Sequence, residues 1–249
     1  MRIRGVKTRL LHANEIPLVD LFQESLPRLK ERSIIAISSK AIALCEGRVA
    51  SKEHVSKREL IEREADWYTP EGFSEYGYNF TIVNNTLIAA AGIDESNADN
   101  SFVLWPENPQ QTANEISDFL RTQFKLEELG VIITDSSSMP PMRRGAMGIM
   151  LAHSGFRAVT SLVQTKDLFG RPFQVESAAI GSGLAAAANV VMGEGVERTP
   201  IAIISDVPFV TFQNRHPNQE ELSAVYIPPE DDLYAPFLLS APWQRKRLT

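Results

Sequence analysis

The residues from 129 to 145 constrain the fold more than any other part of this 249-residue chain. The β-branched, apolar run 129–134 is long enough for a buried strand and too short for a helix. It ends at Asp135, after which come three serines, two prolines and the pair Arg143-Arg144. We therefore expect a strand that delivers a carboxylate into a loop at the edge of a sheet, where α/β proteins commonly bind ligands.

The polar side chains of this loop suit a hard cation and an anion together. Asp135 and Ser136 offer oxygen ligands, whereas Arg143 and Arg144 offer planar guanidinium donors. A phosphate group accompanied by magnesium is the simplest ligand that uses both kinds of side chain.

Composition excludes several classes of protein. With 43% hydrophobic residues the chain can bury an ordinary core, as one large domain or two small ones. The net charge is −6 and the basic residues gather only at 245–247, so we expect no nucleic-acid partner. A single cysteine, Cys45, excludes a disulfide framework within the chain and fits a reducing compartment. Without a signal-peptide pattern at 1–4, or an apolar run near the roughly 20 residues that span a bilayer, we expect a cytoplasmic protein without a membrane partner.

Strand-like and helix-like patterns alternate along the chain, which predicts an α/β (α+β) architecture with mixed β-sheets. Strands are expected at 2–11, 33–37, 78–83, 86–91, 129–134, 149–152, 156–159 and 201–204. Helices are expected at 16–29, 56–67, 106–124 and 177–192. Asn84-Asn85 predicts a hairpin turn, and the small residues of 177–192 predict close packing against another element or subunit.

Three further stretches carry candidate ligands, and each has a plainer interpretation. Asp94, in the run 91–97, either caps local amides in a turn or shares a metal with Asp135. Lys40 follows a buried strand and either touches phosphate or is a solvated surface charge. Glu194 follows the expected helix end at Gly193 and is either a ligand for a cation or a solvated loop acid.

Prolines multiply after residue 206, which leaves room only for a short acidic helix at 218–225. We interpret residues 207–249 as an extended arm with apolar anchors, laid on its own subunit or on a partner. The expected anchors are Tyr226, Tyr234, Phe237 and Trp243.

Four motifs in order give the chain a resemblance to a known family. They are Ala91-Gly92-Ile93-Asp94-Glu95-Ser96-Asn97, Ile132-Ile133-Thr134-Asp135-Ser136 with Arg143-Arg144-Gly145, Lys166-Asp167-Leu168-Phe169-Gly170-Arg171, and Met192-Gly193-Glu194-Gly195. Over about residues 5–206 the sequence resembles the coenzyme F-420-0:L-glutamate ligase (CofE-like) family, including its branch proposed to add glutamate to folate. We accordingly expect a ligase domain at 1–206, with the arm outside it.

The resemblance implies a GTP- or ATP-dependent ligase that joins L-glutamate, as a γ-glutamyl amide, to a carboxylate-bearing cofactor acceptor. It also implies the CofE-like fold, an intertwined homodimer and two divalent ions, Mg²⁺ or Mn²⁺. By motif position, Asp94 and Asp135 would hold one ion, and Ser136 with Glu194 the second. The implied nucleotide contacts are Lys7, Thr8, Arg9, Leu10, Ser39, Lys40, Asn97, Met192, Gly193 and Gly195. With Asp135 as the central catalytic carboxylate, Arg143 or Arg144 would clamp a phosphate or a substrate carboxylate.

Two departures from the family pattern keep other functions open. Leu44 stands where the family often has a lysine, so either Lys40 compensates or the nucleotide preference differs. The loop 136–142 looks closer to the folate-type branch than to the deazaflavin enzymes. A non-catalytic nucleotide- or cofactor-binding module and a metal-dependent phosphoesterase are the alternative hypotheses.

Overall fold

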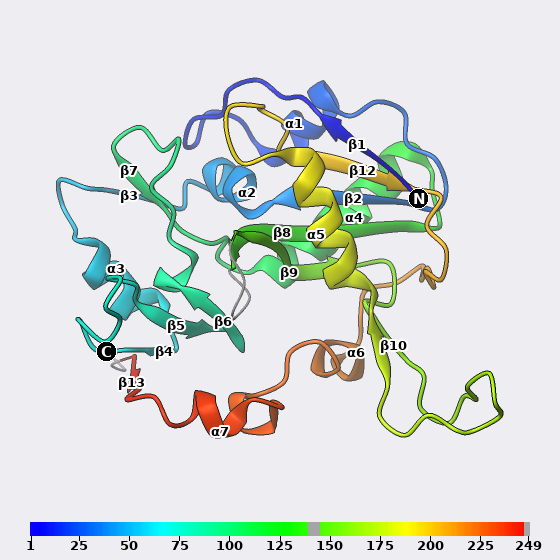
Figure 1. Cartoon of the computed structure of the whole chain (residues 1–249). Helices are drawn as coiled ribbons and strands as arrows, with labels where there is room; N and C mark the ends of the chain where they lie inside the picture. The colour runs from blue at the N-terminus through cyan, green and yellow to red at the C-terminus, as the bar shows by residue number, and fades with distance from the viewer. Residues whose placement is uncertain (139–144, 247–249) are drawn as a thin grey trace.

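A five-stranded mixed sheet forms the centre of the computed structural model, which describes residues 1–138 and 145–246 (Figure 1). Its strands, in spatial order, are β1 (Arg2–Val6), β12 (Ile201–Ser205), β2 (Ser33–Ser38), β8 (Leu129–Ser138) and β9 (Met147–Ser154). Strands β2 and β8 run parallel, whereas the other neighbours are antiparallel. The mixed α/β architecture that the alternation predicts is therefore confirmed.

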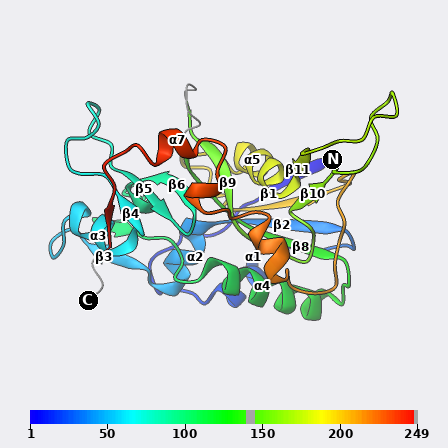
Figure 2. The ribbon, with the colours of Figure 1, turned by 90° about the horizontal axis from the view of Figure 1, so that it is seen from below.

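Helices cover both faces of this sheet (Figure 2). Helix α5 (Ile180–Met192) lies on one face, and α1 (Leu18–Ser25) and α4 (Pro109–Phe124) lie on the other. Strand β2 alternates between the two sides, so that Ile34 contributes to the core under α5 and Ile35 to the core under α4. Burial on both faces explains why β2 is an unbroken apolar run.

The small residues of α5 let it approach β9 closely, as the sequence predicts. A Cβ atom built on Gly148 would lie 2.6 Å from the Cβ of Asn189, and one on Gly181 would lie 2.5 Å from the sulfur of Met150. Helix α5 starts three residues later than expected, because Ser177–Ala179 form strand β11, which pairs with β10 (Val159–Ser161). Strands β10 and β11 and the segment between them project from the body of the molecule (Figure 1).

A smaller sheet forms the other side of the molecule. Its strands, in order, are β13 (Gln244–Arg245), β4 (Trp67–Tyr68), β5 (Phe80–Val83) and β6 (Thr86–Ala89). The remaining elements here are β3 (Val49–Ser51), which pairs with β7 (Ser101–Val103), helix α3 (Lys57–Glu64) and the single turn η1 (Ala90–Gly92). Both Asn84 and Asn85 adopt positive φ, at 47° and 55°, which confirms the predicted hairpin turn.

Several expected boundaries are wrong, and three of the strands show this most clearly. Strand β8 does not end before Asp135 but continues to Ser138, because β9 pairs with it across two register shifts that bend the ladder. Only Val159 of the strand expected at 156–159 is in a strand; Phe156 is instead fully buried in the core. The first strand stops at Val6, well short of residue 11.

The C-terminal arm runs along the bottom of the molecule in Figure 1. The division of the chain into a domain and an arm at residue 206 stays a prediction. It contains α6 (Gln219–Ser223), η2 (Pro229–Asp231), α7 (Ala235–Leu238) and strand β13. Two expected anchors hold it to its own chain: the Tyr226 hydroxyl donates to the Leu151 carbonyl at 2.6 Å, and the Trp243 ring packs edge-on against Trp67. The other two, Tyr234 and Phe237, are exposed.

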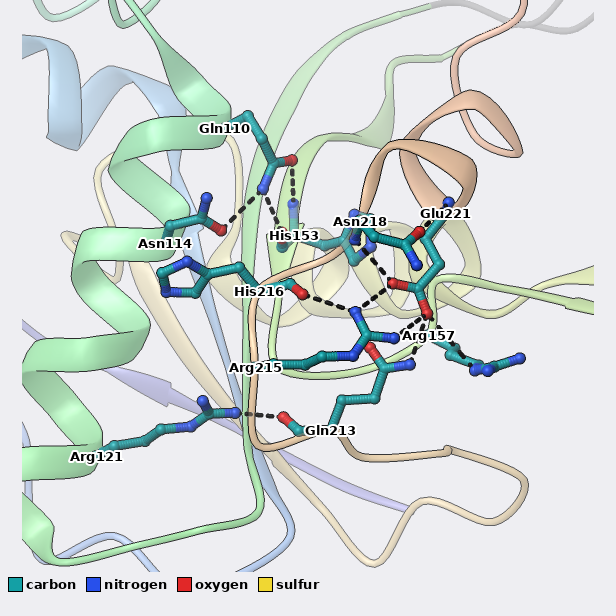
Figure 3. Close-up of polar contacts among 10 residues, drawn as sticks. All are labelled: Gln110, Asn114, Arg121, His153, Arg157, Gln213, Arg215, His216, Asn218 and Glu221. Carbon is teal, nitrogen blue, oxygen red and sulfur yellow. Dashed lines mark hydrogen bonds and ion pairs between the residues drawn. The ribbon is translucent and has the colours of Figure 1, made fainter.

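A carboxylate near the start of the arm accepts hydrogen bonds from several side chains (Figure 3). Glu221 accepts hydrogen bonds from both terminal nitrogens of Arg215, at 2.7 and 2.8 Å, and from the Gln213 amide at 2.6 Å. Arg215 is the main cause that lowers the pKa of Glu221 to about 2, against an opposing effect of burial. The arm thus begins in a cluster of polar and charged side chains around Glu221, beside β9.

Within residues 1–138 and 145–246, helices long and apolar enough to cross a bilayer are absent.

Candidate functional site

The parallel pairing of β2 and β8 builds the candidate site. Because their register places Ser38 opposite Thr134, the next residues, Ser39 and Asp135, meet at the same edge of the sheet. A cavity of about 340 Å³ opens there. It is lined by these expected ligand residues: Thr8, Arg9, Leu10, Lys40, Asp94, Asn97, Asp135, Ser136, Met192, Gly193, Glu194 and Gly195.

Donors from two other elements hold both oxygens of the Asp135 carboxylate. The Ser39 hydroxyl, at the first residue of α2 (Ser39–Glu46), donates to Oδ1 at 2.8 Å. The indole Nε1 of Trp105 donates to Oδ2 at 3.1 Å. Ser39 is therefore a support for Asp135 rather than a lining residue. Trp105, only 7% exposed, was missed by the motif-based prediction, since nothing in its neighbours along the chain suggests a partner 30 residues away.

A glycine of the 91–97 motif makes room for this indole. Gly92 has φ +70°, and a Cβ built on it would lie 2.1 Å from Nε1 of Trp105. Any side chain at this position would therefore push the indole away from the backbone as well as strain the turn. The motif supplies both a carboxylate, at Asp94, and the space that lets Trp105 reach Asp135.

Asp94 fills one of the two roles that the sequence left open, that of a turn cap, and it also pairs with Lys40. Its Oδ1 accepts a hydrogen bond from the Ser96 amide at 2.7 Å, as in a local turn. Its Oδ2 forms an ion pair with the Lys40 ammonium at 2.5 Å on the side of the cavity. Burial raises the pKa of Asp94, but hydrogen bonds and charge from Lys40 and Ser96 outweigh it and keep the pKa below its ordinary value. The carboxylate is therefore ionised and matched with a cation.

Glu194 and Ser136 also meet, although 58 residues separate them. The Ser136 hydroxyl donates to the Glu194 carboxylate at 2.9 Å, and the Asn189 amide on the last turn of α5 donates to its other oxygen. Gly193 ends the helix with φ 79°, as expected, and so turns Glu194 back toward the cavity. Glu194 is thus an exposed acid that two hydrogen bonds hold at the cavity.

The oxygen donors fit a divalent cation by their chemistry, since carboxylate and hydroxyl oxygens are what Mg²⁺ and Mn²⁺ prefer. Asp94 and Asp135 line the same cavity, as a shared ion requires. In the part of the chain that the structure describes, however, no three acidic, histidine or cysteine side chains lie close enough to enclose a metal. The donors are instead paired with Lys40, Trp105 and Asn189, which would have to release them.

Three expected site residues remain to be placed: Lys7, Arg143 and Arg144. Lys7 is exposed and outside the lining of the cavity, so the structure does not bring it to the site. Arg143 and Arg144 lie outside the described residues. Leu44 also lines the cavity, one helical turn after Lys40 on α2. Lys40 therefore supplies a positive charge on the face of the helix where Leu44 supplies none. Arg9 and Arg198 add two further positive side chains to the lining.

The sequence of the whole chain is similar to those of known proteins. A sequence profile described as F420-0:Gamma-glutamyl ligase matches residues 5–206. The chain is 37% identical to the coenzyme F420:L-glutamate ligase of Methanocaldococcus jannaschii over 59% of this chain and 61% of that protein. The proteins of the same name from Methanopyrus kandleri and Methanococcus maripaludis are 31% and 30% identical, over 75% and 84% of this chain and 79% and 89% of theirs.

Proposed function

Because the chain belongs to the F420-0:gamma-glutamyl ligase family, we propose that it joins L-glutamate in a γ-glutamyl amide to a carboxylate-bearing cofactor of the F420-0 or folate type. GTP or ATP is the proposed energy source. The name of the relatives, coenzyme F420:L-glutamate ligase, favours an F420-type acceptor, whereas the loop 136–142 of this chain favours the folate type.

One observation carries the proposal: four carboxylates and three cationic side chains from distant parts of the chain line a single cavity. The carboxylates are Asp94, Asp135, Glu194 and Glu197, and the cationic residues are Arg9, Lys40 and Arg198. Such a mixture suits a triphosphate with divalent ions, since the cations can bind phosphate oxygens directly while the carboxylates bind them through metal.

The chemistry explains why a nucleotide is needed. An amine does not displace oxide from a carboxylate at a useful rate. A carboxylate oxygen of the acceptor therefore attacks the γ-phosphorus, the bond to the bridging oxygen breaks, and nucleoside diphosphate leaves. The amino group of glutamate then attacks the acyl carbon, phosphate leaves with the bonding electrons, and the nitrogen loses a proton. The protein contributes mainly orientation and charge neutralisation to the first step.

The side chains of the cavity divide this task. Lys40, Arg9 and Arg198 would bind phosphate oxygens, and Ser39 with Trp105 would keep the Asp135 carboxylate in one orientation. A bound divalent ion would supply further neutralisation of the phosphate oxygens. The residues that would hold such ions are Asp94, Asp135, Ser136 and Glu194.

The test is Asp135→Asn, which keeps the shape of the side chain and removes its charge. We expect ligation to fall at least about a hundredfold, the scale of losing a strong electrostatic contact. Products are measured by mass spectrometry with F420-0 or folate, glutamate and each nucleotide. Asp20→Asn, on the exposed part of α1, is the matched control and should retain activity.

The same assay separates the alternatives. Phosphate release that does not require glutamate would indicate a phosphoesterase, and nucleotide binding without any release would indicate a non-catalytic module. Near wild-type ligation by Asp135→Asn, with metal affinity unchanged, would contradict the assignment of the site.

We also propose a homodimer. Its support is the projecting segment between β10 and β11, where Leu168 is fully exposed and Phe169 is 84% exposed. Large apolar side chains at such a tip are unfavourable in water and are typical of a surface that another subunit covers. Sedimentation should give twice the mass of the chain, and the double variant Leu168→Ser, Phe169→Ser should shift the protein toward monomer. A wild-type monomer at micromolar concentration would refute the proposal.

A further inference from the structure

A second cavity, of about 460 Å³, lies between the C-terminal arm and the rest of the protein. Its walls come from the β5–β6 hairpin, the residues leading into α4, strand β9 and the arm itself, which contributes Leu222 and Tyr226. The volume is within the range of small-molecule sites, and a junction between two parts of a chain is a common place for one. The arm lies outside the segment that the family profile matches, so this cavity is closed by residues beyond that segment.

The aromatic walls of this cavity are held in place by their polar atoms. The Tyr226 hydroxyl is bound to the Leu151 carbonyl, and the Trp105 indole nitrogen is bound to Asp135. Burial also raises the pKa of Tyr226, so the phenol stays neutral. With its polar atom already used, the partly exposed Tyr226 offers a ligand mainly ring surface, and Trp105, which is 7% exposed, adds a small part of its ring to the wall.

Apart from Glu107 and Thr86, the polar aliphatic side chains of the lining are neutral amides. The side chains of Asn84 and Asn85 form no hydrogen bond within the described residues, and they can both donate and accept. Neither lysine nor arginine is found among the described residues that line this cavity, and its one charged side chain is the acidic Glu107. An anionic phosphate or carboxylate would be repelled here, whereas the first cavity has three cations among its charged side chains.

We propose that the second cavity binds a neutral, planar heteroaromatic ring system with amide-like edges. Resting on the proposed function, this ring is the head group of the acceptor, and the acceptor carboxylate belongs at the first cavity. Trp105 links the two places, since it lines the second cavity while its indole nitrogen holds Asp135, which lines the first. An acceptor with an uncharged ring at one end and a carboxylate at the other matches the two sets of walls.

The test fills the cavity from opposite sides. Thr86→Trp enters from the hairpin and Leu222→Trp from the arm. Thr122→Trp, which adds the same side chain at an exposed position of α4 outside this cavity, is the control. The probes are 5-deazariboflavin and 6-hydroxymethylpterin, which carry such rings without an anionic tail. Titration calorimetry should show binding to the wild type and the control, and a Kd raised about tenfold or more in either filled variant.

Each outcome has a definite meaning. Failure of both probes to bind the wild type at millimolar concentration, or equal binding by a folded filled variant, would overturn the assignment. GTP titrations with magnesium should be unchanged in the filled variants, which shows that the first cavity is intact. If F420-0 or folate is ligated and the filled variants keep its KM, the inference fails while the proposed function stands. If the probes bind and are excluded but ligation never occurs, the function fails while the ring site stands.

Discussion

The indole nitrogen of Trp105 lies 3.1 Å from Oδ2 of Asp135 and donates a hydrogen bond to it. Together with the Ser39 hydroxyl on the other oxygen, this contact fixes the carboxylate at the end of two parallel strands. A carboxylate held in this way presents a defined orientation to a cation, and such supporting contacts commonly determine how well a metal is bound.

Trp105→Phe tests this support. The change keeps an aromatic ring and removes the N–H group, so Asp135 loses one of its two donors. We expect metal affinity and ligation to fall about tenfold to a hundredfold with little loss of folded structure. Magnesium titrations of both nucleotide binding and the rate are the measurement. The control is Trp243→Phe, which also removes an indole hydrogen bond, to Leu238 in the arm. Equal effects of the two variants would count against a specific role for Trp105.

Gly92→Ala tests the space beside that indole. The added Cβ would meet the Trp105 ring at 2.1 Å, and the residue keeps a positive φ. Gly72→Ala is a matched control, because its φ is +76° and no atom lies within 4 Å of the added Cβ. We expect the free energy of unfolding to fall by about 1 kcal/mol in the control and by about 3 kcal/mol at Gly92, where overpacking adds to strain. Urea denaturation measures both, and equal losses would show that the clash is relieved.

The stability of the protein should depend on pH through His153. Its ring is fully buried, and neither ring nitrogen has a partner among the described residues. Burial lowers its pKa to about 4, against an opposing effect of Glu221. In the unfolded chain the histidine has its ordinary pKa of about 6.5, so the unfolded chain binds the proton first as the pH falls. The contribution of neutral His153 to the free energy of unfolding is therefore complete above about pH 6.5 and is lost as the pH falls toward 4.

We expect protonation of His153 in the unfolded chain to lower the free energy of unfolding by about 1–2 kcal/mol as the pH falls from 7 to 5. Urea denaturation at both pH values gives this difference, and His153→Leu, which cannot titrate, should make it smaller. The carboxylates whose pKa is lowered lose their contributions only below about pH 4.5, outside this window; they are Glu59, Asp94, Glu95, Asp167 and Glu221. An identical pH dependence in His153→Leu would show that other groups cause it.

Glu221→Gln should loosen the start of the arm. The change removes the charge that Arg215 contacts with both terminal nitrogens, and we expect a loss of about 1–2 kcal/mol in the local stability of the arm. Hydrogen exchange of residues 207–226 measures it. Glu220→Gln is the control, because this neighbouring side chain is exposed and forms no ion pair within residues 1–138 and 145–246. Equal protection of these amides from hydrogen exchange in the two variants would contradict the importance of the cluster around Glu221.

The local pattern of the sequence determined most of the elements. Alternating apolar runs and helical spacing located the central strands and helices, and turn chemistry located the Asn84-Asn85 hairpin, because these features depend on residues that are neighbours along the chain. Motif order further selected many of the residues that line the first cavity, including Asp94, Asp135 and Glu194.

Only the tertiary structure decided which partner each side chain meets. The continuation of β8 past Asp135 depends on the hydrogen bonds that β9 offers, and the contact of Trp105 with Asp135 depends on the space left by Gly92. The second cavity exists only because the arm packs against β9 through Tyr226. Propensity acts over a few residues, whereas these contacts join residues that are brought together only when the core is packed.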